Sequence, residues 1–147
     1  MRVSTEIADR IIEIATREGA ALGKALSIAV VDVGGYIVAI RRNDGARPLT
    51  PSIALSKAYS AAIMQRPTNM LQAWAEHEPV FFSQIATMGW QPIVATQGGI
   101  TLKKDGEFLG GIGISGGTAD EDQKIAETVI AELGFDTDFA AWAGAKK

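Results

Sequence analysis

The chain has 147 residues, of which 47% are hydrophobic and 21% charged, ordinary values for one soluble globular domain. Its formal net charge of -3 argues against a nucleic-acid-binding protein, since such proteins usually carry a basic surface. Cysteine is absent, which excludes disulfides, thiolate metal sites and cysteine nucleophiles. No signal peptide and no membrane-spanning run is recognisable, so we expect a cytoplasmic protein without a membrane partner.

The first fifty residues predict one helix followed by one hairpin. Apolar residues recur at steps of three and four after a Ser4 or Thr5 N-cap, which indicates an amphipathic helix that ends near Gly23. Two β-branched runs, at 28–33 and 36–41, then stand on either side of a Gly-Gly pair. This pattern is typical of two antiparallel strands joined by a tight turn.

The middle of the chain is predicted to be helical. A helix begins at Thr50 and Pro51, which serve as N-cap and first-turn proline, and ends at Arg66–Pro67. Shorter helical stretches follow at 68–78 and 80–88. Small residues form a thin face on the first of these helices, suited to close packing against a sheet or another helix: Ala54, Ala58, Ala61 and Ala62.

The last third predicts three strands and a final helix. The strands are placed around 93–95, 99–103 and 107–115, and the helix at 119–133, ended by Gly134. Helices and hairpins in this order indicate an α+β fold, an antiparallel sheet flanked by helices. We expect one domain over residues 1–147, with a core of about 4–134 and a partly apolar tail, 135–147, that docks on the body or on a neighbouring subunit.

A glycine-rich run at 108–117 leads directly into the acidic start of the final helix. It is not a Walker loop, because no Lys followed by Ser or Thr ends it, and its G-x-G-x-x-G spacing lies in a hairpin strand rather than in the first turn of a βαβ unit. Two interpretations stay open. The glycines belong to a close-packing strand before a helix capped by Thr118 and Glu121, or they form a pocket wall whose helix N-terminus offers N–H groups to an anion.

Lys57 is the most suggestive ionisable residue, since it shares a helix face with small apolar residues. A lysine in such surroundings must pair, extend to solvent or shift its pKa. It can form a structural ion pair with Asp122 or Asp44, bind an anionic ligand, or act as a base or covalent catalyst.

Two further places carry candidate binding residues. Arg42 precedes a turn that Asp44 can stabilise, and its planar guanidinium suits a carboxylate or a haem propionate. His77, the one histidine, stands between two glutamates and cannot build a protein-only zinc site. It is a surface or interface residue, an axial haem ligand or a general base. Nearby aromatic residues belong to the core or an interface, or line a flat cavity.

Several of these stretches together resemble the GlcG/HbpS family, also called the haem-degrading or DUF336 family, which includes the C-terminal domain of PduO-type proteins. The resemblance runs from about residue 7 to residue 133. It is carried by the helix-core pair Lys57-Ala58, by G-x-G-x-S-G-G followed by Asp122, and by D-x-x-G-x-x-x-x-x-x-R-x-D-G-A at Asp32, Gly35, Arg42, Asp44, Gly45 and Ala46. Where the family usually has Pro-Gly-Gly, this chain has Gln97-Gly98-Gly99.

The resemblance implies a roughly five-stranded antiparallel sheet with helices on its faces, similar to profilin or PAS domains. It also implies homo-oligomers built from tight dimers, octamers in some members, and haem as the candidate cofactor. We therefore expect a homo-oligomer that binds haem or another flat carboxylate-bearing molecule in a pocket at a subunit boundary. The residues expected to shape or contact that pocket are Arg42, Lys57, His77, Gln97, Gly98, Gly99, Ser115, Gly116 and Gly117.

Two alternatives belong to other functional classes. A cofactor-independent lyase, isomerase or hydratase of a small organic acid would use Lys57 as base or charge anchor, with Asp122 or Asp44 as partner. Backbone amides near Gly98–Gly99 would then stabilise an oxyanion. A sensor or partner-binding subunit is the third possibility, and it rests on the PAS-like fold alone.

Overall fold

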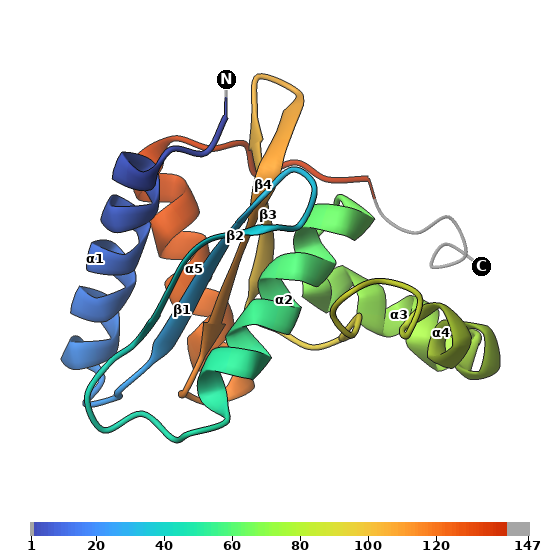
Figure 1. Cartoon of the computed structure of the whole chain (residues 1–147), viewed down its shortest axis with the longest axis horizontal. Helices are drawn as coiled ribbons and strands as arrows, with labels where there is room; N and C mark the ends of the chain where they lie inside the picture. The colour runs from blue at the N-terminus through green and yellow to red at the C-terminus, as the bar shows by residue number, and fades with distance from the viewer. Residues whose placement is uncertain (1, 141–147) are drawn as a thin grey trace.

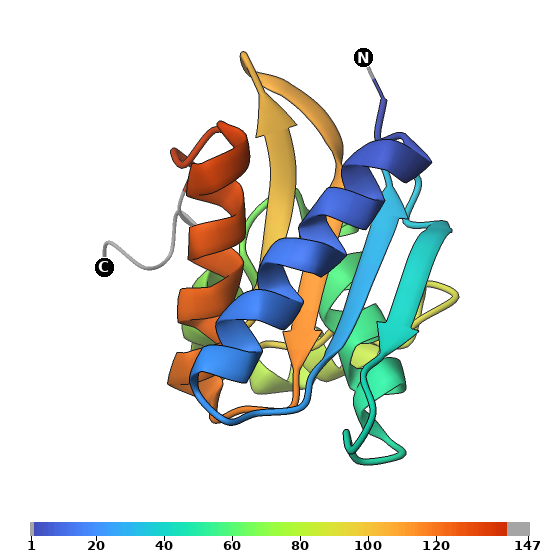
Figure 2. The same ribbon diagram turned by 90° about the vertical axis from the view of Figure 1, so that its left-hand side faces the viewer.

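The structure, a computed structural model, describes residues 2–140, so residues 141–147 of the expected tail lie outside it. One antiparallel sheet in the order β2-β1-β4-β3 has α1 and α5 on one face and α2 on the other (Figures 1 and 2). In chain order the elements are α1 (Thr5–Ala21), β1 (Ser27–Asp32), β2 (Ile37–Arg42), α2 (Thr50–Met64), the 3₁₀ helix η1 (Thr68–Met70), α3 (Leu71–His77), α4 (Pro79–Ile85), β3 (Gly99–Lys104), β4 (Glu107–Ser115) and α5 (Ala119–Leu133).

The described sheet has four strands, so the α+β class is confirmed but the strand count is one lower than expected. The segment predicted as a strand at 93–95 has no strand partner. The Ile93 N–H donates to the carbonyl of Ala86, and the Val94 N–H donates to the Ser60 hydroxyl. Ile93 also packs against Leu71. These contacts satisfy the backbone locally, which explains why an apolar β-branched stretch stays irregular.

The main core lies between the sheet and the helix pair α1 and α5. Alternate strand residues, among them Ile28, Val30, Ile112 and Ile114, are fully buried in this layer. The apolar faces of both helices close it, as the three- and four-residue spacing of α1 predicted. Figure 2 shows the two helices side by side across this face of the sheet.

The opposite layer is much thinner, because α2 rests almost directly on β4. A Cβ atom placed on Gly113 would lie 2.0 Å from the Ala54 carbonyl oxygen, and one on Gly111 would lie 2.4 Å from that of Ala58. The alanine face of α2 therefore meets the glycines of β4. This confirms the close-packing interpretation of the glycine run, and it explains why the sequence alternates glycine with isoleucine there.

Both reverse turns of the sheet lie at the positions that the sequence predicted. The carboxylate of Asp32 accepts hydrogen bonds from Gly34 N at 2.9 Å and Tyr36 N at 3.0 Å, which organises the β1–β2 hairpin. Gly35 has φ 80°, a left-handed conformation that glycine adopts without strain. Asp105 and Gly106 form the β3–β4 turn. The first part of the D-x-x-G motif thus serves the hairpin.

The α3–α4 arm, residues 71–85, projects from the body beside the end of α2 (Figure 1). A small cluster of Leu71, Phe82 and Ile93 holds it together, and Trp74 packs edge-on against Phe82. The predicted helical stretches at 68–78 and 80–88 are confirmed in outline, with a break at Glu78–Pro79. None of the helices in residues 2–140 is long and apolar enough to cross a membrane.

Candidate functional site

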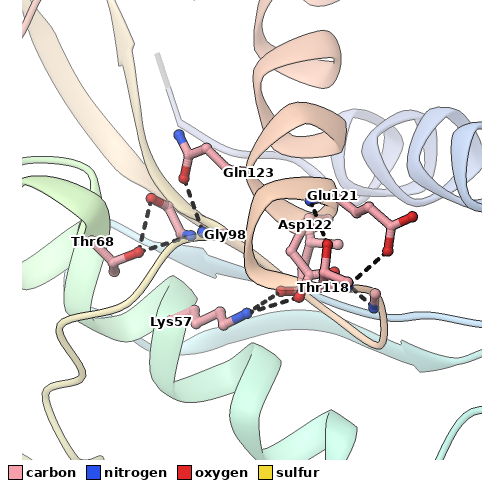
Figure 3. Close-up of polar contacts among 10 residues, drawn as sticks. Lys57, Thr68, Gly98, Thr118, Glu121, Asp122 and Gln123 are labelled. Carbon is pink, nitrogen blue, oxygen red and sulfur yellow. Dashed lines mark hydrogen bonds and ion pairs between the residues drawn. The ribbon is translucent and has the colours of Figure 1, made fainter.

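The strongest polar feature is a buried group that we call the Lys57 cluster: Lys57, Asp122, Gly98, Gly117 and the carbonyl of Ile114 (Figure 3). The Lys57 ammonium donates to the Ile114 carbonyl at 2.7 Å and to the Asp122 carboxylate at 3.2 Å. The other oxygen of Asp122 accepts from Gly117 N at 2.9 Å. Of the two partners considered for Lys57, the structure places Asp122 beside it and not Asp44.

This ion pair joins the two layers of the fold. Lys57 belongs to α2, on one face of the sheet, whereas Asp122 belongs to the first turn of α5, on the other face. The lysine side chain passes beside the ends of β3 and β4, where Ile114 N donates to Gly98 O. The cluster therefore fixes both helices to one corner of the sheet.

Burial sets the electrostatics of the pair. The side chains of Lys57 and Asp122 are only 5% and 4% exposed. Burial lowers the pKa of Lys57 and raises the pKa of Asp122, and in each case the partner's charge opposes the shift. A substrate cannot reach the ammonium without displacing protein atoms. The geometry therefore favours a structural ion pair over the base, charge-anchor and ligand-binding roles considered for Lys57.

Two glycines make room for this arrangement. A Cβ atom on Gly98 would lie 2.8 Å from the Lys57 ammonium nitrogen, and the φ of 111° at this position also favours glycine. A Cβ atom on Gly99 would lie 2.6 Å from the Lys57 carbonyl oxygen. The Gly98–Gly99 pair that the sequence suggested as a pocket wall thus lies directly against α2.

Thr68 and Gln123 complete the surroundings of these glycines, and sequence reasoning did not single them out. Gly99 N donates to the Thr68 hydroxyl at 3.0 Å, and Gly98 N donates to the Gln123 side-chain oxygen at 2.9 Å. Both side chains are buried. Neither residue is titratable, so no chemical signal in the sequence marked them.

The N-terminus of α5 is closed by its own side chains. The Thr118 hydroxyl accepts from Glu121 N, and the Glu121 carboxylate accepts from Thr118 N, the capping box that the sequence predicted. Gly117 N is used by Asp122. These contacts occupy N–H groups that an anion would need, so the anion-binding interpretation of the glycine run is not supported by this geometry.

The remaining predicted site residues divide into two groups. Ser115, Gly116 and Gln97 lie near the Lys57 cluster: Ser115 is buried at the end of β4, Gly116 packs against Ala25, and the Gln97 amide donates to Asp120 at 2.9 Å.

Arg42, Asp44 and His77 are not brought to this cluster. Arg42 lies at the end of β2, where its Nε donates to the Ala46 carbonyl at 2.9 Å and closes the loop that contains Asp44. Arg42 and Asp44 are both exposed.

His77 ends α3 on the exposed side of the arm. Its Nδ1 lies 2.8 Å from the Ala73 carbonyl oxygen, so this nitrogen carries the proton when it donates there, and Nε2 becomes the basic nitrogen of the ring. Val80 and Phe81, at the start of α4, are 72% and 49% exposed. The arm therefore offers an imidazole together with unusually exposed apolar side chains.

A second exposed apolar surface, the Tyr36–Trp90 patch, lies beside the β1–β2 hairpin. Its residues are Tyr36, Ile63, Met88 and Trp90, all exposed. The rings of Tyr36 and Trp90 stack at 6.1 Å, and Trp90 also packs on Tyr59. Across the described residues 2–140, no three His, Asp or Glu side chains are placed together as metal ligands.

The fold and these motifs define the family. A family model described as haem-degrading protein HbpS-like matches residues 3–131, and the chain belongs to this family.

Particular relatives agree with this assignment. An uncharacterised 15.0 kDa protein from the dhaT–dhaS intergenic region of Citrobacter freundii is 31% identical over 137 residues, which are 88% of this chain and 96% of the relative. Protein GlcG of Escherichia coli is 30% identical over 113 residues, 77% of this chain and 81% of GlcG. The solved structure of a PduOC:haem complex superposes with a TM-score of 0.85 at 25% identity, covering 95% of this chain and all of that one.

Proposed function

We propose that this protein is a cytoplasmic homo-oligomer that binds haem, or another flat carboxylate-bearing ligand, against the α3–α4 arm. The observation that carries the proposal is the exposed imidazole of His77, held through Nδ1 by the Ala73 carbonyl, on an arm with exposed Val80 and Phe81. The haem named in the structural neighbour from PduO supports the choice of ligand.

A haem site needs an iron ligand, apolar contacts for the macrocycle and positive charge for the propionates, and the residues of the arm supply the first two. A histidine whose Nδ1 donates to a backbone carbonyl presents Nε2 to a metal in a fixed orientation. Exposed Val80 and Phe81 offer apolar contact to the flat macrocycle. Bound haem would supply iron redox chemistry, and the protein's part is to hold the iron through His77.

The third need, positive charge for the propionates, is not met within the arm. No Lys or Arg occurs from residue 67 to residue 102, and Glu76 and Glu78 flank the histidine. We propose that exposed arginines from the Arg42 loop of a second subunit supply this charge. The ligand would then lie at a subunit boundary, and the site would be incomplete in a monomer.

The Tyr36–Trp90 patch supports self-association. Exposed aromatic and aliphatic groups gathered from a hairpin, a helix and a loop are typical of interaction surfaces. We propose that this patch contributes to the dimer from which the oligomer is built, with the octamer as the largest assembly expected.

A haemin titration followed at the Soret band tests the function. We expect a saturable, stoichiometric shift for the unmodified protein. His77→Ala should change the form of the spectrum and weaken binding by at least roughly tenfold, since the bond from His77 to the iron would be lost. Arg42→Ala should weaken binding more modestly, because it removes a propionate contact and leaves the iron ligand.

Gln84→Ala is the matched control, since it also replaces an exposed polar residue of the arm. It should leave both spectrum and affinity unchanged. Sedimentation of the haem-loaded protein at several protein concentrations should show that bound haem is found with the oligomer. A spectrum that is the same in His77→Ala as in the unmodified protein, or the lack of any saturable shift, would overturn the proposed site.

A further inference from the structure

A cavity of about 530 Å³ is lined in part by Gln123, whose side-chain oxygen accepts from Gly98 N of the Lys57 cluster. It lies between η1, α5 and the chain that follows α5. Met70, Ile100, Ile130 and Phe139 form most of its apolar wall. Small-molecule sites commonly have volumes of roughly 300–1,000 Å³ and apolar walls with few polar groups, and this cavity meets both conditions.

The outer wall of the cavity is firmly held. After α5 the chain turns back, and Asp136 N donates to the Lys103 carbonyl at 2.7 Å. The ammonium of Lys103 lies 4.8 Å from the centre of the Phe139 ring and 3.6 Å from the Asp138 carboxylate. It also donates to the Asp138 carbonyl. Phe139 is therefore placed by specific contacts, and the described part of the tail docks on the body of the protein.

The charge of the cavity favours one class of ligand. Glu127 is the one ionisable residue of its lining, is exposed, and makes no ion pair with any side chain in the described residues 2–140. Among the described residues 2–140, no Lys, Arg or His lines the cavity, and the nearby ammonium of Lys103 is already paired with Asp138. An anion such as a propionate would meet repulsion here, whereas a cation would find an unpaired carboxylate.

We propose that this cavity is a second ligand site, separate from the arm, that takes a small cationic amphiphile. The ammonium group of the ligand pairs with Glu127, and its apolar body packs between Met70 and Phe139. Asn69, exposed at the rim, offers a further hydrogen bond. This site does not depend on haem binding, because its charge selects against haem.

Three fluorescent probes that share one apolar dye separate charge from hydrophobicity. Dansylcadaverine carries an ammonium group, N-pentyldansylamide has the same alkyl chain without a charge, and dansyl-ε-aminocaproic acid carries a carboxylate. We expect one dansylcadaverine per chain, bound about two- to fivefold more tightly than N-pentyldansylamide, the size of effect that a partly exposed ion pair gives. The acid should bind most weakly, and added salt should reduce the differences.

Two substitutions on exposed positions of α5 test the location without disturbing the core. Glu127→Gln should make the amine and the neutral probe bind equally. Ala131→Trp, one helical turn further on, should block the cavity and abolish binding of all three probes. Glu13→Gln makes the same charge change on α1 and should have no effect. Met88→Ala should also keep full binding, which would show that the probes do not bind on the exposed Tyr36–Trp90 patch.

The proposal fails if the acid binds as tightly as the amine. It also fails if Ala131→Trp retains full binding, or if Met88→Ala removes it. Haemin binding by the same protein would be unchanged by Glu127→Gln and Ala131→Trp, so failure of this site is distinguishable from failure of the proposed function.

Discussion

Replacing Asp122 with alanine is expected to lower the free energy of unfolding by about 3–5 kcal/mol, because it leaves the Lys57 ammonium buried without a counter-charge. The two side chains are almost completely enclosed, so bulk water cannot solvate the ammonium once the carboxylate is gone. The variant would also lose the hydrogen bond to Gly117 N. Equilibrium denaturation in urea, for the two proteins side by side, measures the difference.

The stability of the Asp122→Ala variant should also change with pH in a direction that can be checked independently. Burial already lowers the pKa of Lys57 in the intact protein, and removing Asp122 takes away the interaction that opposes this shift. The folded variant then binds fewer protons than the unfolded chain, whose lysine pKa is about 10.4. Stability should therefore rise as pH increases toward that value.

Two control variants test whether the loss of stability in Asp122→Ala comes from the buried ion pair. Asp120→Ala, in the same helical turn but exposed, should cost far less. The double variant Lys57→Met with Asp122→Leu should recover most of the loss, since a buried ion pair can often be replaced by apolar residues. A cost below about 1 kcal/mol for Asp122→Ala, the range of exposed pairs, would contradict the buried arrangement.

Gly113→Ala is expected to destabilise the protein by about 3 kcal/mol, the upper part of the range for overpacking a core. The added methyl group would stand 2.0 Å from the Ala54 carbonyl oxygen and 2.7 Å from Ala58 N. Both are backbone atoms of α2, so no side-chain rotation relieves the clash. The helix must move away from the sheet, and the Lys57 cluster on the same helix would be strained with it.

Gly34→Ala is the matched control for this substitution. Gly34 also lacks a left-handed φ, but its nearest neighbours are atoms of the Tyr36 side chain, which is 64% exposed and can move. Urea denaturation should show only a small change for this variant. If Gly113→Ala is as stable as Gly34→Ala, α2 does not rest on β4 as closely as the structure has it.

The Lys57 cluster shows that several residues of the family motifs have a structural role. Asp122, Gly98, Gly117 and Lys57 are among the residues by which the chain resembles its family, yet they contact one another rather than an open pocket. Their pattern marks the closure of two helices on a sheet. The exposed residues of the arm, which carry the proposed function, lie largely outside these motifs.

The sequence by itself determined the local structure of this protein to a large extent. The spacing of apolar residues in α1, the capping box of α5 and the Asp-Gly turn between β3 and β4 each depend on neighbours within a few residues, and all three are confirmed. Close packing was expected as one of two alternatives for the alanine face of α2 and for the glycine run, but their contact with each other was not. Backbone geometry and helix periodicity are local properties, which is why they can be read along the chain.

Only the tertiary structure decided which distant groups meet. Lys57 pairs with Asp122 rather than Asp44 because α2 and α5 close on the same corner of the sheet, 65 residues apart in sequence. The segment at 93–95 stays irregular because Ser60 and Ala86 satisfy its backbone. The cavity beside Glu127 exists because Lys103 holds Phe139 in place. Burial and long-range pairing depend on the packing of whole layers, and no stretch of sequence contains that information locally.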